Sequence, residues 1–198
     1  MPPKTSHVLV VLGAFLTGLV IFLGVFFYAT GQFGGGGPGP SAIGGPFNLI
    51  DQNGKPVTDQ DIKGKPYLVF FGYTHCPDVC PATLFEVSEL LRALGKDRDR
   101  AGALFITVDP ERDTAPVLKD YLSSFDPRLR AATGDQKAIE AVEKFYRVYA
   151  KKVPSDNADY SMDHTALVYL MDKQGRFVAP FSLKRRPEEA AADLRKYF

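Results

Sequence analysis

The sequence is poor in the residues that would indicate many common functions. Its 198 residues include only two cysteines and three histidines, and its formal net charge is +1. Two cysteines are too few for the disulfide-dense scaffolds of small secreted proteins. A net charge close to zero gives no indication of a nucleic-acid partner or of an acidic protein partner. No internal repeat is apparent, so we expect one globular domain with appended segments.

One of these appended segments is an uncharged run near the N-terminus. Residues 8–29 are mostly Val, Leu, Phe, Ile, Gly and Ala, and the run is long enough to span a membrane as a helix. Lys4 precedes it, which favours a retained transmembrane anchor with residues 1–7 in the cytoplasm. A cleaved signal peptide is the alternative, because Ala29 and Gly31 are small enough to flank a cleavage site.

Residues 30–46 are rich in glycine and proline and predict a flexible linker to a domain over residues 47–198. In this domain, apolar strands alternate with amphipathic helices, which predicts an α/β fold with helices flanking a mixed central sheet. Strands are expected at 47–57 (two, joined by an Asn-Gly turn), 66–71, 103–109, 129–133, 148–153, 165–171 and 176–183, and helices at 81–94, 115–124, 135–146 and from 187.

Both cysteines lie in the segment Cys76-Pro77-Asp78-Val79-Cys80-Pro81, which follows the apolar strand at 66–71. A residue before proline is pushed out of the helical region, so we expect Cys76 and Cys80 to be non-helical. Pro81 would then be the first residue of the helix. At the positive end of the helix dipole, the pKa of both thiols is expected to be lowered. A cysteine loop between a strand and a helix predicts a thioredoxin-like fold.

The three histidines differ in their prospects as metal ligands. His7 lies beside the uncharged run and is interpreted as a bystander, whereas His75, next to Cys76, could be a ligand, a modifier of thiol pKa or a solvated loop residue. His164 follows a polar loop at 154–163, and we expect it to begin a strand beside the cysteine loop. Two thiolates and an imidazole bind Cu(I) well and Zn(II) or Cu(II) acceptably. With three ligands the site would be open, although a loop histidine that only makes hydrogen bonds is the alternative.

Two other functions use the same cysteine pair. A thiol–disulfide oxidoreductase needs only Cys76 and Cys80, but thioredoxins separate their cysteines by two residues and face them with a cis-proline. Here three residues separate the cysteines, and the facing segment is Met162-Asp163-His164. A peroxiredoxin-like protein would fit the cysteine position but would leave His164 without a task. These comparisons favour a metal site, to which Asp78 or Asp163 could contribute by orienting a ligand or tuning the charge.

Four segments of the sequence resemble the Sco (SenC) family of membrane-anchored copper chaperones for cytochrome c oxidase assembly. They are Phe-Gly-Tyr-Thr-His-Cys-Pro-Asp-Val-Cys-Pro at 71–81, Val-Asp-Pro-Glu-Arg-Asp-Thr at 108–114, residues 121–125, and Asp163-His164-Thr165. The resemblance, which covers most of 47–183, implies that Cys76, Cys80 and His164 bind one copper ion, as Cu(I) or Cu(II). Asp78 and Asp163 also match family positions, and Thr165 stands where many members have serine.

The resemblance also implies a biological role. Such a chaperone delivers copper to, or keeps reduced the cysteines of, the binuclear copper site of oxidase subunit II, and it is not an enzyme with turnover. Another periplasmic copper chaperone or a thiol reductase is a further expected partner. No mitochondrial transit peptide is visible before residue 8, so we expect a bacterial inner-membrane protein whose soluble domain faces the periplasm. A disulfide between Cys76 and Cys80 would abolish copper binding, which makes the site sensitive to redox state.

Overall fold

The N-terminal part of the chain forms a single helix. The computed structural model describes residues 5–29, 43–154 and 160–198, and the chain divides into two compact units, Met1–Pro40 and Ser41–Phe198. The first unit contains α1 (Thr5–Ala29), of which Leu9–Phe26 has a mean hydropathy of 2.7 and no buried residue. By length and composition this helix can cross a membrane, as predicted for residues 8–29. The linker predicted at 30–46 lies almost entirely outside the described residues.

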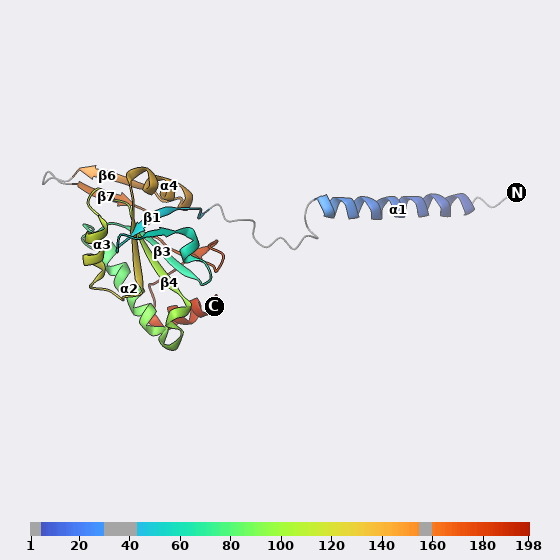
Figure 1. The fold of residues 1–198 in the computed structure, drawn as a ribbon. Coiled ribbons are helices and arrows are strands. Elements are labelled where there is room, and N and C mark those ends of the chain that lie inside the picture. The colour runs from blue at the N-terminus through green and yellow to red at the C-terminus, as the bar shows by residue number, and fades with distance from the viewer. Residues whose placement is uncertain (1–4, 30–42, 155–159) are drawn as a thin grey trace. The chain divides into compact units, whose positions relative to one another are not determined.

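The second unit alternates strands and helices (Figure 1). Its strands are β1 (Asn48–Asp51), β2 (Pro56–Thr58), β3 (Tyr67–Gly72), β4 (Gly102–Thr107), β5 (Leu129–Thr133), β6 (Ala150–Pro154), β7 (Tyr160–His164), β8 (Val168–Met171) and β9 (Phe177–Pro180). Its α-helices are α2 (Val79–Ala93), α3 (Ala115–Leu122), α4 (Gln136–Tyr146) and α5 (Pro187–Arg195), and short 3-10 helices cover Asp59–Ile62 and Gly95–Arg100.

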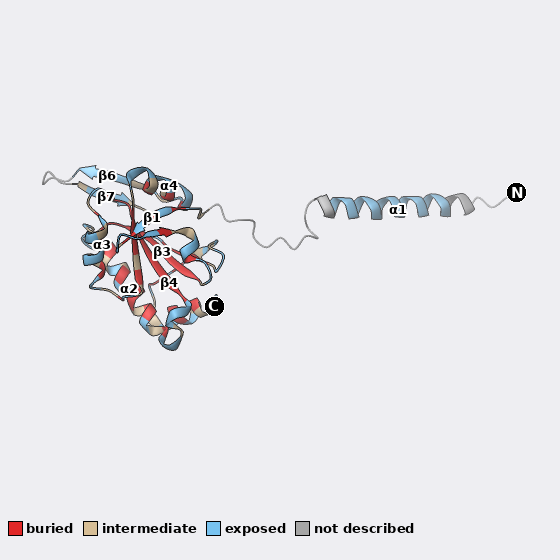
Figure 2. Cartoon of the chain, in the orientation of Figure 1, coloured by how far each residue is buried: buried red, intermediate tan, exposed pale blue. Residues whose placement is uncertain are grey.

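Seven of the strands form one mixed sheet in the order β2-β1-β5-β4-β3-β8-β9. The central strands β3, β4 and β5 are parallel, and antiparallel strands flank them on both sides. Every residue of β3 and β4 is buried, as Figure 2 shows in red, because strands covered on both faces exclude water along their whole length. The predicted α/β fold with a mixed central sheet and flanking helices is therefore confirmed.

Successive side chains of β3 point to opposite faces of this sheet. Phe71 packs against Tyr146 of α4, with ring centroids 5.3 Å apart. Phe70 packs on the other face against Phe105 of β4, which in turn contacts Tyr121 of α3. Gly72 lies on the same face as Phe70, and α2 begins above it. The loop between β3 and α2 therefore lies at the carboxyl end of β3, on the face of the sheet that α2 and α3 cover.

The region before β8 differs from the prediction. The expected polar loop at 154–163 instead contains β7, which pairs antiparallel with β6 in a separate two-stranded sheet. In this hairpin Ala150 lies opposite His164. His164 therefore ends a strand rather than beginning one, and the next strand starts at Val168 rather than at residue 165. The polar sequence of β7 hid this strand because only Met162 of its five residues is buried.

Candidate metal centre

The first two candidate ligands lie where β3 passes into α2. The helix begins at Val79 with Asp78 as its N-cap, so Cys80 is in the first turn, and the prediction of a non-helical Cys80 is wrong. The preference of a residue before proline is only a bias, and Pro81 is tolerated because the first N–H groups of a helix have no partner within it. Cys76 precedes the helix, and its sulfur accepts the Cys80 backbone N–H at 3.4 Å.

The thiol of Cys80 lies against the sheet. Its side chain is completely buried, with an exposed fraction of 0%, whereas Cys76 is partly exposed. Burial raises the pKa of the Cys80 thiol, so the expected lowering by the helix dipole is wrong for this residue. The position depends on Gly72, because a Cβ atom there would lie 2.7 Å from the Cys80 sulfur and 2.8 Å from the Phe105 ring. The missing side chain of Gly72 therefore makes room for the sulfur.

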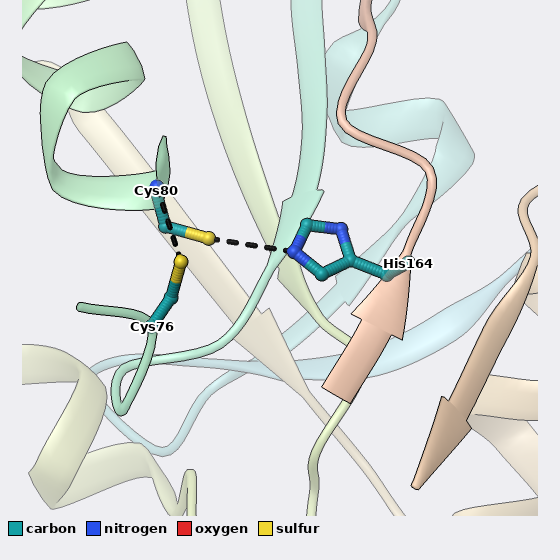
Figure 3. A group of neighbouring side chains, drawn as sticks. All are labelled: Cys76, Cys80 and His164. Atoms are coloured by element: carbon teal, nitrogen blue, oxygen red, sulfur yellow. Dashed lines mark hydrogen bonds between the residues drawn. The ribbon is translucent and has the colours of Figure 1, made fainter. Parts of the chain in front are cut away.

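The third candidate ligand comes from the end of β7. His164 Nε2 lies 3.6 Å from the Cys80 sulfur, as Figure 3 shows. Its other ring nitrogen, Nδ1, is 3.1 Å from the carbonyl oxygen of Thr165, which can only accept a hydrogen bond. Nδ1 therefore carries the proton, and the lone pair of Nε2 points towards the sulfurs. Tyr73 packs at 89° to the imidazole, with ring centroids 5.7 Å apart, and so limits rotation of the ring.

The structure brings the three predicted ligands together. One ligand atom from each of Cys76, Cys80 and His164 lies within 4.8 Å of the other two. Two sulfurs and one imidazole nitrogen form a soft donor set, which fits copper and excludes the hard cations that prefer oxygen. Three protein ligands leave at least one coordination position open to a ligand from outside the chain.

The other candidates lie elsewhere. Asp78 and Asp163 are exposed, and Asp163 is out of step with Met162 and His164 on β7, so strand alternation directs it to the opposite side. Among the described residues no hydrogen bond joins either carboxylate to a ligand. His75 is exposed, and its Nδ1 lies 3.1 Å from the Thr74 hydroxyl, outside the three-ligand group. His7 lies in α1, in the other unit.

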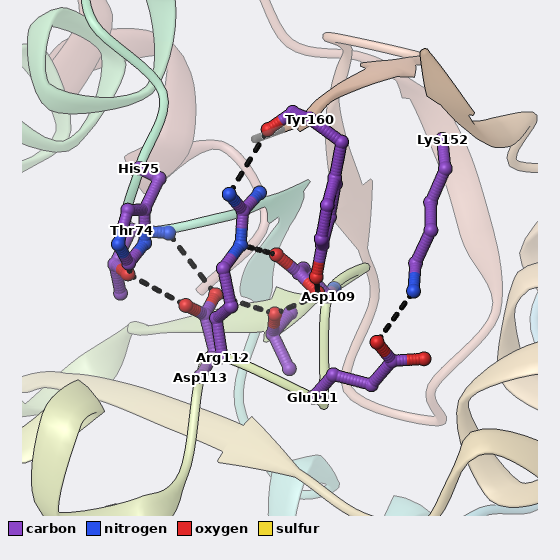
Figure 4. Close-up of polar contacts among 9 residues, drawn as sticks. Thr74, His75, Asp109, Glu111, Arg112, Asp113, Lys152 and Tyr160 are labelled. Carbon is purple, nitrogen blue, oxygen red and sulfur yellow. Dashed lines mark hydrogen bonds and ion pairs between the residues drawn. The ribbon is translucent and has the colours of Figure 1, made fainter. Parts of the chain in front are cut away.

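A buried carboxylate behind the cysteine loop was not predicted as a site residue. Asp113 is completely buried and accepts hydrogen bonds from the Thr74 hydroxyl at 2.6 Å, the Thr74 N–H at 3.0 Å and the Thr107 hydroxyl at 2.6 Å. Burial raises its pKa, and these hydrogen bonds oppose that rise. Its neighbour Thr114 is the N-cap of α3. Asp113 instead anchors the residue two positions before Cys76 (Figure 4).

Comparison with known proteins agrees with this geometry. Residues 36–198 match the family described as SCO1/SenC. The chain belongs to the SCO1/SenC family. It is 41% identical over 143 residues to an SCO2-like protein of Rickettsia prowazekii, covering 71% of this chain and 70% of that protein.

Solved structures of Sco proteins are also similar. Copper-bound ScoI of Bradyrhizobium japonicum is 67% identical with a TM-score of 0.77, covering 79% of this chain and 99% of that one. Copper-bound yeast Sco1 is 35% identical with a TM-score of 0.71, covering 78% of this chain and 87% of that one. These Sco structures confirm the predicted thioredoxin-like fold.

Proposed function

We propose that this Sco protein is a copper-binding chaperone in which Cys76, Cys80 and His164 hold one copper ion, as Cu(I) or Cu(II). The observation that carries this proposal is the convergence of two sulfurs and one imidazole nitrogen within 4.8 Å of one another. The donor set suits copper, and the copper-bound ScoI of Bradyrhizobium japonicum, at 67% identity, supports the same cargo here.

The acceptor in this proposal is the binuclear copper site of cytochrome c oxidase subunit II, which the chain supplies with copper or keeps in the reduced thiol form. Transfer by ligand exchange needs an open path by which a ligand of the acceptor reaches the metal. Cys76 and His164 are both partly exposed, so an acceptor can approach the metal from their side. Cys80 remains buried behind them. The protein then acts by binding and release, without catalytic turnover.

The location that fits this role is the bacterial inner membrane. The apolar helix α1 suits membrane anchoring, and we place residues 1–7 in the cytoplasm and the domain over 47–198 in the periplasm. Another periplasmic copper chaperone or a thiol reductase would supply copper or electrons there. Retention of the helix is checked by the mass of the mature protein isolated from membranes.

The decisive experiment titrates the reduced protein with Cu(I) and Cu(II). We expect one copper per chain and, because one of three ligands is lost, a fall in Cu(I) affinity of about 100-fold in His164→Ala, which corresponds to roughly 2.7 kcal/mol. The exposed His75→Ala serves as the matched control and should retain the wild-type affinity. Unchanged affinity in His164→Ala would refute the three-ligand site.

One observation favours a second function. Both cysteines are free thiols, and they are close enough for the Cys80 N–H to contact the Cys76 sulfur at 3.4 Å. The pair can therefore take part in thiol–disulfide exchange. Reduction of a disulfide substrate should then survive in His164→Ala and be lost in Cys76→Ser. If copper stoichiometry is near zero while this reductase activity is present, the oxidoreductase is the better assignment.

A further inference from the structure

The hairpin that carries His164 has no strand partner in the main sheet. β6 and β7 pair only with each other among the described strands, so backbone hydrogen bonds of the seven-stranded sheet do not fix their position. Most side chains of the hairpin are exposed, and Met162 is its one buried residue. Something other than a strand ladder must therefore hold the imidazole at its distance from the two sulfurs.

Side-chain contacts of Arg112 contribute to this attachment, together with the burial of Met162 and the ion pair between Lys152 and Glu111. Nη1 of Arg112 donates to the backbone oxygen of Tyr160 at 2.9 Å, and its Nε donates to Asp109 at 2.5 Å. Its guanidinium carbon lies 3.7 Å from the centre of the Tyr160 ring. The Tyr160 hydroxyl donates a hydrogen bond to the other carboxylate oxygen of Asp109 at 2.8 Å. Arg112, Asp109 and Tyr160 thus form a closed set of contacts, which we call the hairpin clamp (Figure 4).

The hairpin clamp connects the buried core to the strand that carries His164. Asp109 is 1% exposed and its backbone N–H donates to the buried Thr107 hydroxyl, so one end of the clamp belongs to the core. Tyr160 and His164 are four residues apart on β7 and therefore lie on the same side of the strand. The other end of the clamp thus holds the strand that presents the imidazole.

The same short segment also holds the cysteine side of the site. Asp113, next to Arg112, binds Thr74 through two hydrogen bonds. Residues 109–113 therefore contact both the loop with the cysteines and the hairpin with the histidine. The two groups of ligands, which come from distant parts of the sequence, share one support.

We propose that Arg112 is a positioning residue for copper, acting through the hairpin clamp to hold His164 within bonding range of the sulfurs. The proposal rests on the three-ligand site proposed above. It assigns no contact between Arg112 and the metal. It predicts that loss of Arg112 weakens copper binding solely by displacing His164 from the metal.

The test is a double-mutant cycle on the full chain in detergent, with Cu(I) affinity as the measurement. Arg112→Gln should lower the affinity about tenfold, the size typical when a group supporting a metal ligand is removed. In the His164→Ala background the same substitution should cause no further loss, because its only route to the metal is already gone. The nitrogen hyperfine coupling of the Cu(II) form should weaken in Arg112→Gln and approach that of His164→Ala.

Two further variants keep the test decisive if Arg112→Gln folds poorly. Tyr160→Phe removes only the hydroxyl bond to Asp109, and we expect a loss of about threefold that also disappears without His164. Glu189→Gln is the matched control, since it removes an exposed ion pair with Arg186 at α5 and touches neither the hairpin nor the clamp, so the copper affinity should not change.

Separate outcomes overturn the two proposals. If His164→Ala has no effect on affinity, the metal site itself is wrong. If His164→Ala weakens binding but Arg112→Gln and Tyr160→Phe do not, the clamp has no positioning role. Equal losses from Arg112→Gln with and without His164 would show that it acts through the cysteines or through the fold, and this also overturns the proposal.

Discussion

The two regions that form the candidate metal centre are held in different ways. The cysteine loop follows β3, a strand buried along its whole length, and its second cysteine is completely enclosed. The β6–β7 hairpin is a largely exposed two-stranded sheet that contacts the rest of the domain through the hairpin clamp and the buried Met162. Cys80 thus lies inside the core, whereas His164 lies at the end of a hairpin that the core covers only in part. This difference would suit a copper chaperone, because the buried Cys80 could retain the metal while His164 is displaced by a ligand of the acceptor.

The largest expected effect concerns the side fixed by the core. Cys80→Ser should reduce copper binding to near zero, because a hydroxyl is a hard donor that does not ionise near neutral pH. The loss should exceed that of His164→Ala, whose two sulfurs still bind Cu(I). Copper bound per chain is measured after gel filtration, and circular dichroism checks folding. One copper per chain in folded Cys80→Ser would remove Cys80 from the ligand set.

The two sides should also differ in the protons that they release. Burial raises the pKa of the Cys80 thiol, so this thiol is neutral at pH 6 to 8 and copper must displace its proton. Higher pH therefore favours binding, and Cys80 alone should raise the apparent Cu(I) affinity about tenfold per pH unit. The slope is measured by competition with a chelator of known pH dependence. It should persist in His164→Ala, and a flat profile would contradict a protonated Cys80.

The sequence predicted the side fixed by the core better than the side held by polar contacts. Continuous apolar runs revealed β3 and β4, and the prolines located the cysteine loop to within two residues. β7 was missed because its sequence is polar. It forms a strand through backbone hydrogen bonds with β6, which leave no pattern in the side chains. The raised pKa of Cys80 was missed because it depends on burial of the thiol against the sheet, including Phe105 of β4, which lies 25 positions away. Local pattern carries no information about such contacts.

The role of Asp113 was missed for the same reason. Its partner Thr74 lies 39 positions away, and only the fold brings the two together. The segment 108–114 was noted in the sequence only for its resemblance to a family, and no structural role was predicted for it. The structure supplies two tasks for this segment, anchoring the cysteine loop and clamping the hairpin. A dense run of charged residues after a buried strand was the available signal.

A substitution behind the cysteine loop should be more damaging than one on the hairpin. In Gly72→Ala the new methyl group would lie 2.7 Å from the Cys80 sulfur, within a buried strand that cannot easily move. Such overpacking should lower the free energy of unfolding by about 1–3 kcal/mol. Ser161→Ala, at an exposed position of β7, is the matched control and should change it by less than about 0.5 kcal/mol. Urea denaturation compares them, and equal stabilities would refute the close packing at Gly72.

The smallest effect lies in α4, the helix that leads into the hairpin. Burial, with a further contribution from Glu140, raises the pKa of Glu143 to about 7 from an ordinary value of 4.5. The folded protein therefore holds this proton more tightly than the unfolded chain does. The free energy of unfolding should fall as the pH rises from 4.5 to 7, because the folded state must then hold a partly buried carboxylate in its charged form.

Glu143→Gln should abolish this fall. At pH 8 the variant should be more stable than the wild type by about 1 kcal/mol, a value reduced to allow for solvent screening of the half-exposed carboxylate. At pH 4, where the wild-type carboxyl is neutral in both states, the two should have similar stability. The exposed Glu86→Gln, on α2 beside the cysteine loop, should keep the wild-type pH profile. Urea denaturation at the two pH values is the measurement, and parallel profiles for wild type and Glu143→Gln would show that the charge of Glu143 does not oppose folding.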